Sequence, residues 1–228
     1  MVWPEVEQAA TNRRYELVLS GDKINKRLED EKALDPQIWT LTKLNFLEIS
    51  SCPSLEQLSD EIDKLTHLST LTLTSNKLRQ IPSSMKTLQH LRHLNLSNNQ
   101  IQFLPTDFFI HFNQLETLNL SNNLLEELPN FSGESYPKLA IINVSRNQLK
   151  SLPDFPSNLE NLSLIDLSSN LFQIFPNAIF HLHSLKTILI ESNQLNEIPP
   201  QLSQLHKLKG FHSNLPLSFS TSAPFSSS

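Results

Sequence analysis

The sequence predicts an α/β solenoid, in which short parallel strands from successive coils form one curved sheet behind a helical N-terminal cap. Three observations predict it: a leucine pattern repeats at a fixed interval, an asparagine follows each expected strand after the first, and a proline follows each of these asparagines. The steps between pattern starts are all 23 or 24 residues, which is typical of stacked coils. The starts are Leu44, Leu68, Leu91, Leu115, Leu139, Leu162 and Leu185.

Within each repeat the pattern reads Leu-x-x-Leu-x-Leu-x-x-Asn-x-Leu. The second and third leucines, such as Leu71 and Leu73, are two residues apart, so their side chains point to the same face of a strand. We expect that face to pack into the core and the strands to stack side by side. Equivalent core positions are then neighbours across the sheet, as for Leu71, Leu94, Leu118 and Ile142.

The asparagine position has a structural explanation. An amide donates and accepts hydrogen bonds at once, so it can satisfy backbone groups of neighbouring coils where the chain leaves the strand. In the first coil Cys52 takes this place; a thiol is a weak donor and can fill it, and a reactive thiol is the alternative. The structural asparagine column is Asn76, Asn99, Asn123, Asn147, Asn170 and Asn193.

Each expected strand after the first is followed by an apolar residue and a proline. Proline fixes φ and lacks an N–H, which suits an extended return path. Apolar residues then recur every three or four positions, as in Ile62, Leu65 and Leu68, and indicate short helical turns on the convex side. The proline pairs are Ile81-Pro82, Leu104-Pro105, Leu128-Pro129, Leu152-Pro153, Phe175-Pro176 and Ile198-Pro199.

These motifs resemble the leucine-rich repeat family in its 23–24-residue form, over about residues 36–209. The resemblance implies a right-handed horseshoe with strands on the inside. We divide the chain into a helical cap (1–35), the repeats (36–209) and a disordered serine-rich tail (210–228), because the eighth start at Leu208 is not completed. In the cap we expect Val6, Ala10 and Leu17 to share one stripe of a helix.

Basic residues in the cap invite a second interpretation. They could contact a phosphate, but acidic residues are interleaved with them, which favours a solvated surface of mixed charge. These basic residues are Arg13, Arg14, Lys23, Lys26 and Arg27.

The segments Trp3-Pro4-Glu5, Arg13-Arg14, Leu17 to Gly21 and Leu47 to Ser50 are similar to one group within the family. In that group the repeats precede a domain akin to part of the β-subunit of phenylalanyl-tRNA synthetase. The resemblance implies a link to tRNA or translation as an alternative function. Because that domain is missing here, we expect a truncated or alternatively spliced product.

The concave side chains between the core residues are mostly small and polar. Ile141, Leu164 and Leu189 are exceptions on three successive strands. Exposed apolar clusters rimmed by charge mark partner contacts, although another segment of the protein could instead cover them. The candidate partner-binding residues are Ile141, Leu164, Leu189, Arg146, Asp166, Glu191, His93, Asn119 and Asn143.

Composition excludes several function classes. The chain has 228 residues, three glycines, one cysteine and a net charge of −5, and it shows no phosphate loop, catalytic triad or metal-ligand set. We therefore expect no enzyme activity, no cofactor and no metal, and a protein partner bound by a non-catalytic scaffold. Direct nucleic-acid binding is not expected, because the concave face has few basic residues. We further expect a cytoplasmic monomer without a membrane segment.

Overall fold

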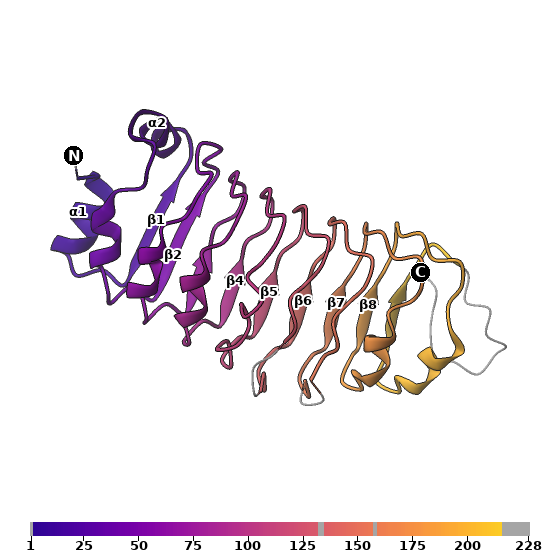
Figure 1. Ribbon diagram of the computed structural model, residues 1–228. Coiled ribbons are helices and arrows are strands. Elements are labelled where there is room, and N and C mark those ends of the chain that lie inside the picture. Colours follow the sequence, from indigo (N-terminus) through magenta and orange to yellow (C-terminus); the bar gives the residue numbers. More distant parts are fainter. Residues whose placement is uncertain (1, 132–134, 157–158, 216–228) are drawn as a thin grey trace.

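A computed structural model (Figure 1) describes residues 2–131, 135–156 and 159–215. Its centre is one parallel sheet in which the strands follow one another in sequence order, β1 to β9. Each strand adds one step along a curved solenoid, as the repeat predicts. The strands are β1 (Glu16–Ser20), β2 (Phe46–Ser50), β3 (Thr70–Thr72), β4 (His93–Asn95), β5 (Thr117–Asn119), β6 (Ile141–Asn143), β7 (Leu164–Asp166), β8 (Thr187–Leu189) and β9 (Gly210–His212).

Core positions align across the sheet as the repeat interval predicts. Leu71 pairs with Leu94, Leu94 with Leu118, and Leu118 with Ile142. All four side chains are buried, so the aliphatic residues of successive coils form one continuous hydrophobic core. The predicted register is confirmed.

The convex side consists of short 3₁₀ helices and extended segments. The helices are η1 (Pro36–Thr40), η2 (Asp60–Lys64), η3 (Ser83–Thr87), η4 (Asn177–His181) and η5 (Pro200–Gln204), and Figure 1 shows several of them along one side of the sheet. Between η3 and η4, aromatic side chains pack against one another on the convex side. Phe109 stacks on Phe131 with ring centroids 4.2 Å apart, and the Tyr136 hydroxyl donates to the Phe109 carbonyl at 2.9 Å.

The asparagine column forms a ladder between coils. The Asn123 Oδ1 accepts from the Ile101 N–H at 3.0 Å, while its Nδ2 donates to the carbonyls of Leu96 (2.9 Å) and Leu120 (3.0 Å). Ile101 and Leu96 belong to the preceding coil, so each amide links two coils, as expected. Cys52 occupies the same place in the first coil and is buried; its Sγ donates to the Ser50 carbonyl at 3.2 Å.

The N-terminal cap differs from the expected all-helical stripe. It contains α1 (Pro4–Thr11), then β1, then α2 (Asp22–Glu31), so Leu17 lies on a strand. The helix buries Val6 and Ala9 and leaves Ala10 exposed. The physical reason is an alternation from Glu16 to Ser20, in which every second side chain enters the core, while pairing with β2 supplies the hydrogen bonds that a helix would otherwise provide.

Polar contacts fasten the cap to the first coil. The buried Asp35 carboxylate accepts from the Trp3 N–H at 2.6 Å and from the Gln37 N–H at 2.9 Å. The second contact caps η1. The first joins the start of α1 to the start of the repeats, so the cap covers the end of the core that the first coil would otherwise expose.

At the other end, the sheet continues past residue 209, where we expected the repeats to end. Gly210–His212 forms β9, which pairs with β8 through Ile188 and Phe211. Phe211 is only partly buried because no further coil covers it within the described residues. Residues 216–228 of the expected disordered tail lie outside the described residues. No helix in the described part of the chain is long and apolar enough to cross a membrane.

Candidate protein-interaction face

The concave face is formed by the strand side chains that alternate with the core residues. The ladder arranges them in two rows that run across all nine strands. The first row contains Glu16, Phe46, Thr70, His93, Thr117, Ile141, Leu164, Thr187 and Gly210. The second row contains Val18, Glu48, Thr72, Asn95, Asn119, Asn143, Asp166, Leu189 and His212.

Aliphatic side chains gather on β6, β7 and β8. Ile141 is 39% exposed and pairs directly with the half-buried Leu164. Leu189 follows on β8, but it is paired with Asp166 and therefore lies in the second row, diagonal to Leu164. We call Ile141, Leu164 and Leu189 the aliphatic patch. It is a bent line across three strands, because its last member stands two residues further along its strand.

Charged residues border the patch on the side where the strands end. Arg146 is exposed and holds a left-handed backbone, with φ of 55°, in the turn after β6. Asp166 sits beside Leu189, and Glu191 is exposed just after β8. The three charged residues thus lie at or just beyond the C-terminal ends of the strands that carry the patch, and their role as its rim stays a prediction. Within the first row, Ile141 is paired with Thr117 on β5, and Leu164 is paired with Thr187 on β8.

The polar candidates are partly committed to local structure. The Oδ1 atoms of Asn119 and Asn143 each accept from the N–H two residues later, at 3.0 Å, and so shape the turn after their strands. Their side-chain N–H groups make no hydrogen bond within the described residues and remain available on the concave face. His93 is exposed, and its Nδ1 lies 2.9 Å from the Thr117 hydroxyl.

The electrostatics of this face are weakly acidic. Neither row contains a lysine or an arginine, whereas the acidic members are Glu16, Glu48 and Asp166. Among the residues that the structure describes, no group of three or more His, Cys, Asp or Glu side chains is placed to hold a metal ion. The face offers apolar contact and hydrogen bonding, with little attraction for a polyanion.

Sequence reasoning missed the N-terminal end of this face. Val18 is 50% exposed in the second row, and Tyr15 next to β1 is 57% exposed. They line a groove of about 540 Å³ with Glu5 and Gln8 of α1. The usable signal was the alternation between Glu16 and Ser20, which identifies a strand and therefore an additional concave position.

Comparisons with known proteins agree with this architecture. A family model described as leucine rich repeat matches residues 66–125 and 137–195, just over half of the chain. Among solved structures, a Listeria monocytogenes internalin (InlF) is 21% identical, with a TM-score of 0.63 over 78% of this chain and 52% of its own. TLR13, solved as a complex with ssRNA13, is 26% identical, with a TM-score of 0.68 over 81% of this chain and 27% of its own.

A Leptospira interrogans leucine-rich repeat protein is 27% identical over 88% of this chain and 66% of its own, with a TM-score of 0.45. This chain therefore spans less than two thirds of the length of each of these three proteins.

Proposed function

The chain belongs to the leucine-rich repeat family, and from that premise we propose that it is a non-catalytic scaffold whose concave face binds a protein partner. One observation carries the proposal. Ile141 and Leu164 stand side by side, at least partly exposed, in rows that are otherwise mostly polar. Leu189 extends this apolar surface diagonally across β8.

A partner that covers the patch removes its apolar side chains from contact with water, which is favourable. Apolar surface that leaves water gains roughly 25 cal/mol per Å², so aliphatic side chains held on a rigid sheet favour a partner that covers them. Charged residues at the rim, such as Arg146 and Glu191, contribute less to affinity and more to orientation of the partner. The strand backbone is already hydrogen-bonded in the free protein, so binding there orders less of the scaffold than binding to a loop would.

The test compares two single substitutions on the concave face. Leu164→Asp places a charge in the aliphatic patch, and Thr70→Asp places the same charge in the same row on β3. Both side chains are half-buried, so both variants should fold alike, which circular dichroism checks. We expect proteins crosslinked to the native chain in intact cells to be lost with Leu164→Asp and retained with Thr70→Asp.

Two outcomes would overturn this assignment. If every crosslinked partner survives Leu164→Asp in the folded protein, the patch is not the binding site. If Leu164→Asp instead destabilises the full-length protein far more than Thr70→Asp, the patch is covered by another segment of the same protein.

The second candidate function is an accessory role in tRNA or translation chemistry. It is favoured by the N-terminal segments around Trp3-Pro4-Glu5 and Arg13-Arg14, for which we propose a resemblance to leucine-rich repeat-containing protein 47. The TLR13 structure is a complex with ssRNA13, but here the two concave rows lack lysine and arginine. Salt-titrated filter binding with tRNA separates the candidates: steeply salt-dependent, tight binding supports the second, and no binding at low salt removes it.

A cytoplasmic location and a monomeric state stay predictions of this proposal. Cell fractionation tests the location, and sedimentation equilibrium tests the state.

A further inference from the structure

A pocket with three cations lies where the cap meets the first coil. It has a volume of about 430 Å³ and is lined by Arg13 and Arg14 from the turn after α1 and by Lys43 from the loop before β2. No acidic residue lines it, although the chain as a whole is acidic, with a net charge of −5. The remaining lining residues are Ala9, Ala10, Thr40, Leu41 and Thr42.

The basic residues of the cap differ in their surroundings. Lys26 is exposed and does not line the pocket, and Arg14 also lines the neighbouring groove that contains Glu5 and Glu16. Lys23 and Arg27 both pair with Glu5, at 3.4 Å and 2.5 Å, and the Arg27 guanidinium lies 5.6 Å from the centre of a Trp3 ring. These contacts give Lys23 and Arg27 a structural role within the cap. By contrast, the cations of the pocket make no ion pair and no side-chain hydrogen bond with any described residue, and all three are exposed.

Stabilisation of α1 explains only part of this arrangement. Cations just after a helix interact favourably with its last carbonyls, and α1 has no basic residue in its last turn, so Arg13 or Arg14 serves that need. It does not explain Lys43, which comes from a different coil and lines the same space. Nor does it explain arginine at position 13, where the left-handed backbone, with φ of 49°, favours glycine or asparagine.

The donor set of the pocket matches a phosphate group. Two guanidinium groups offer paired N–H donors that fit phosphate oxygens, and a lysine adds a mobile point charge. The Thr42 hydroxyl, also exposed on the lining, makes no hydrogen bond with a described residue. The backbone carbonyl of Thr42 lies 2.9 Å from the Nδ1 of His67, and this contact holds the loop in place beside the pocket.

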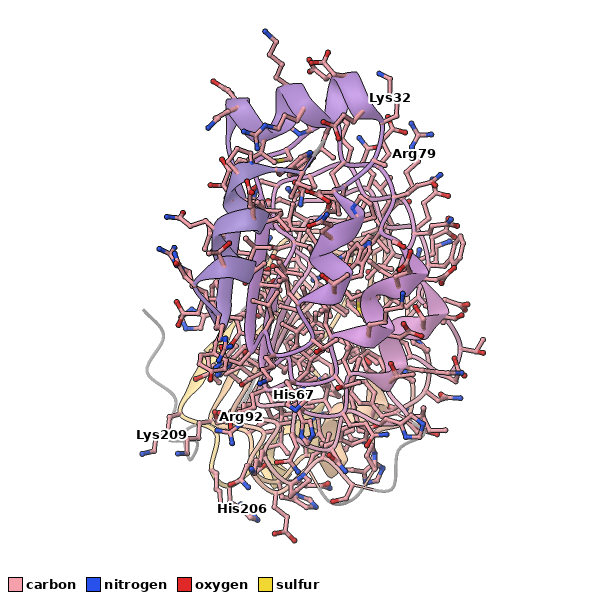
Figure 2. All side chains as sticks on the ribbon, turned by 90° about the vertical axis from the view of Figure 1, so that its left-hand side faces the viewer. Lys32, His67, Arg79, Arg92, His206 and Lys209 are labelled. Atoms are coloured by element: carbon pink, nitrogen blue, oxygen red, sulfur yellow. The ribbon has the colours of Figure 1, made fainter. Side chains whose placement is uncertain are left out.

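The cations do not continue as a track along the solenoid. Figure 2, viewed from the N-terminal end, shows His67, Arg92, His206 and Lys209 in the lower half of the molecule. Arg92, however, faces Glu116 at 3.9 Å. The positions equivalent to Lys43 in later coils are His67, His90, Gln114, Lys138, Asn161, Ser184 and Lys207.

Lysines at this position are therefore separated by two or three coils in which the same position carries no full positive charge. A nucleic-acid strand needs regularly spaced phosphate contacts, whereas a single phosphate needs only one cluster.

We propose that the pocket of Arg13, Arg14 and Lys43 binds a phosphate monoester, carried as a phosphoserine or phosphothreonine on the protein partner. The inference rests on the proposed function in one respect, namely that the ligand belongs to a protein. A monoester carries close to two negative charges at neutral pH. Three unpaired cations therefore complement a monoester better than they complement the single negative charge of a carboxylate. The pocket lies outside the aliphatic patch, so the two surfaces can be tested separately.

The probe is a five-residue peptide, Gly-Ala-phosphoserine-Ala-Gly with blocked ends, titrated into ¹⁵N-labelled full chain and followed by NMR. We expect saturable shifts confined to Arg13, Arg14, Lys43 and their neighbours, and none with the unphosphorylated peptide. Lys43→Glu should weaken binding by about tenfold or more, which corresponds to the loss of one charge-assisted contact. Arg14→Ala is the second variant, and thermal melts confirm that both fold.

Two matched controls make the result specific. Lys207→Glu makes the same charge change at the equivalent position of the last coil, and Leu164→Asp disrupts only the aliphatic patch; both should leave peptide binding unchanged. Absence of saturable shifts, or equal loss in Lys207→Glu, would overturn the proposal. So would tighter, Lys43-dependent binding of tRNA or of phosphatidylserine vesicles, which would assign the pocket to another anion. Loss in Leu164→Asp alone would implicate the patch instead.

Discussion

Removal of one amide from the asparagine ladder gives the sharpest stability prediction. Asn123 is 5% exposed and serves three buried backbone groups, the N–H of Ile101 and the carbonyls of Leu96 and Leu120. Asn123→Ala removes all three contacts at once. The Leu96 and Leu120 carbonyls each keep a second hydrogen bond, from the Asn99 and Asn147 amides, so only the Ile101 N–H is left unsatisfied. A buried polar group left unsatisfied costs roughly 1–3 kcal/mol, which is the loss that we predict.

Equilibrium urea unfolding followed by circular dichroism measures this loss. The control is Gln102→Ala in the preceding coil, which removes an exposed amide whose side chain makes no hydrogen bond with a described residue; its effect should stay within about 0.5 kcal/mol. The reasoning would be refuted if Asn123→Ala cost less than about 1 kcal/mol, because water or a relaxed backbone would then be able to replace the amide.

Three further predictions concern the cap, the thiol and the aromatic part of the core. Burial tends to raise the pKa of Glu5, but its contacts with Arg27 and Lys23 lower it overall. These ion pairs therefore stabilise the fold at neutral pH, and the stabilisation is lost as the pH falls below the ordinary pKa near 4.5. The urea midpoints of the native chain and of Glu5→Gln should accordingly converge in acid. Burial raises the pKa of the Cys52 thiol, so alkylation monitored by mass spectrometry should be slow in the native protein and fast in urea. Phe109→Ala removes a fully buried ring and should cost about 3–5 kcal/mol in the same unfolding assay.

The repeat made the fold predictable because it constrains every coil in the same way. Leu71 and Leu94 could be placed side by side from the interval alone, and the Asn76 amide could be assigned to the backbone of the adjacent coil, where it accepts from Cys52 and donates to Ile49. Such contacts depend only on the register. The ends lack that constraint, so β1 and β9 were not expected as strands.

The candidate sites show the same division. Ile141 and Leu164 were predicted as neighbours because both hold the same repeat position. Leu189 lies two residues beyond Thr187, the residue that pairs with Leu164, so the register places Leu189 diagonally to Leu164. The pocket at Lys43 could not be predicted, because Arg13 and Arg14 precede the repeat and only the packing of α1 and β1 brings them to the first coil.

The central claim is that the concave aliphatic patch contacts a protein partner, and site-specific photocrosslinking tests it most directly. A benzophenone amino acid replaces Leu164 in one version and Ile174 in another; Ile174 is 79% exposed and lies outside both concave rows. In intact cells we expect a discrete crosslinked protein from position 164 and none from position 174. A crosslinked protein from 174 alone, or from neither position, would contradict the claim.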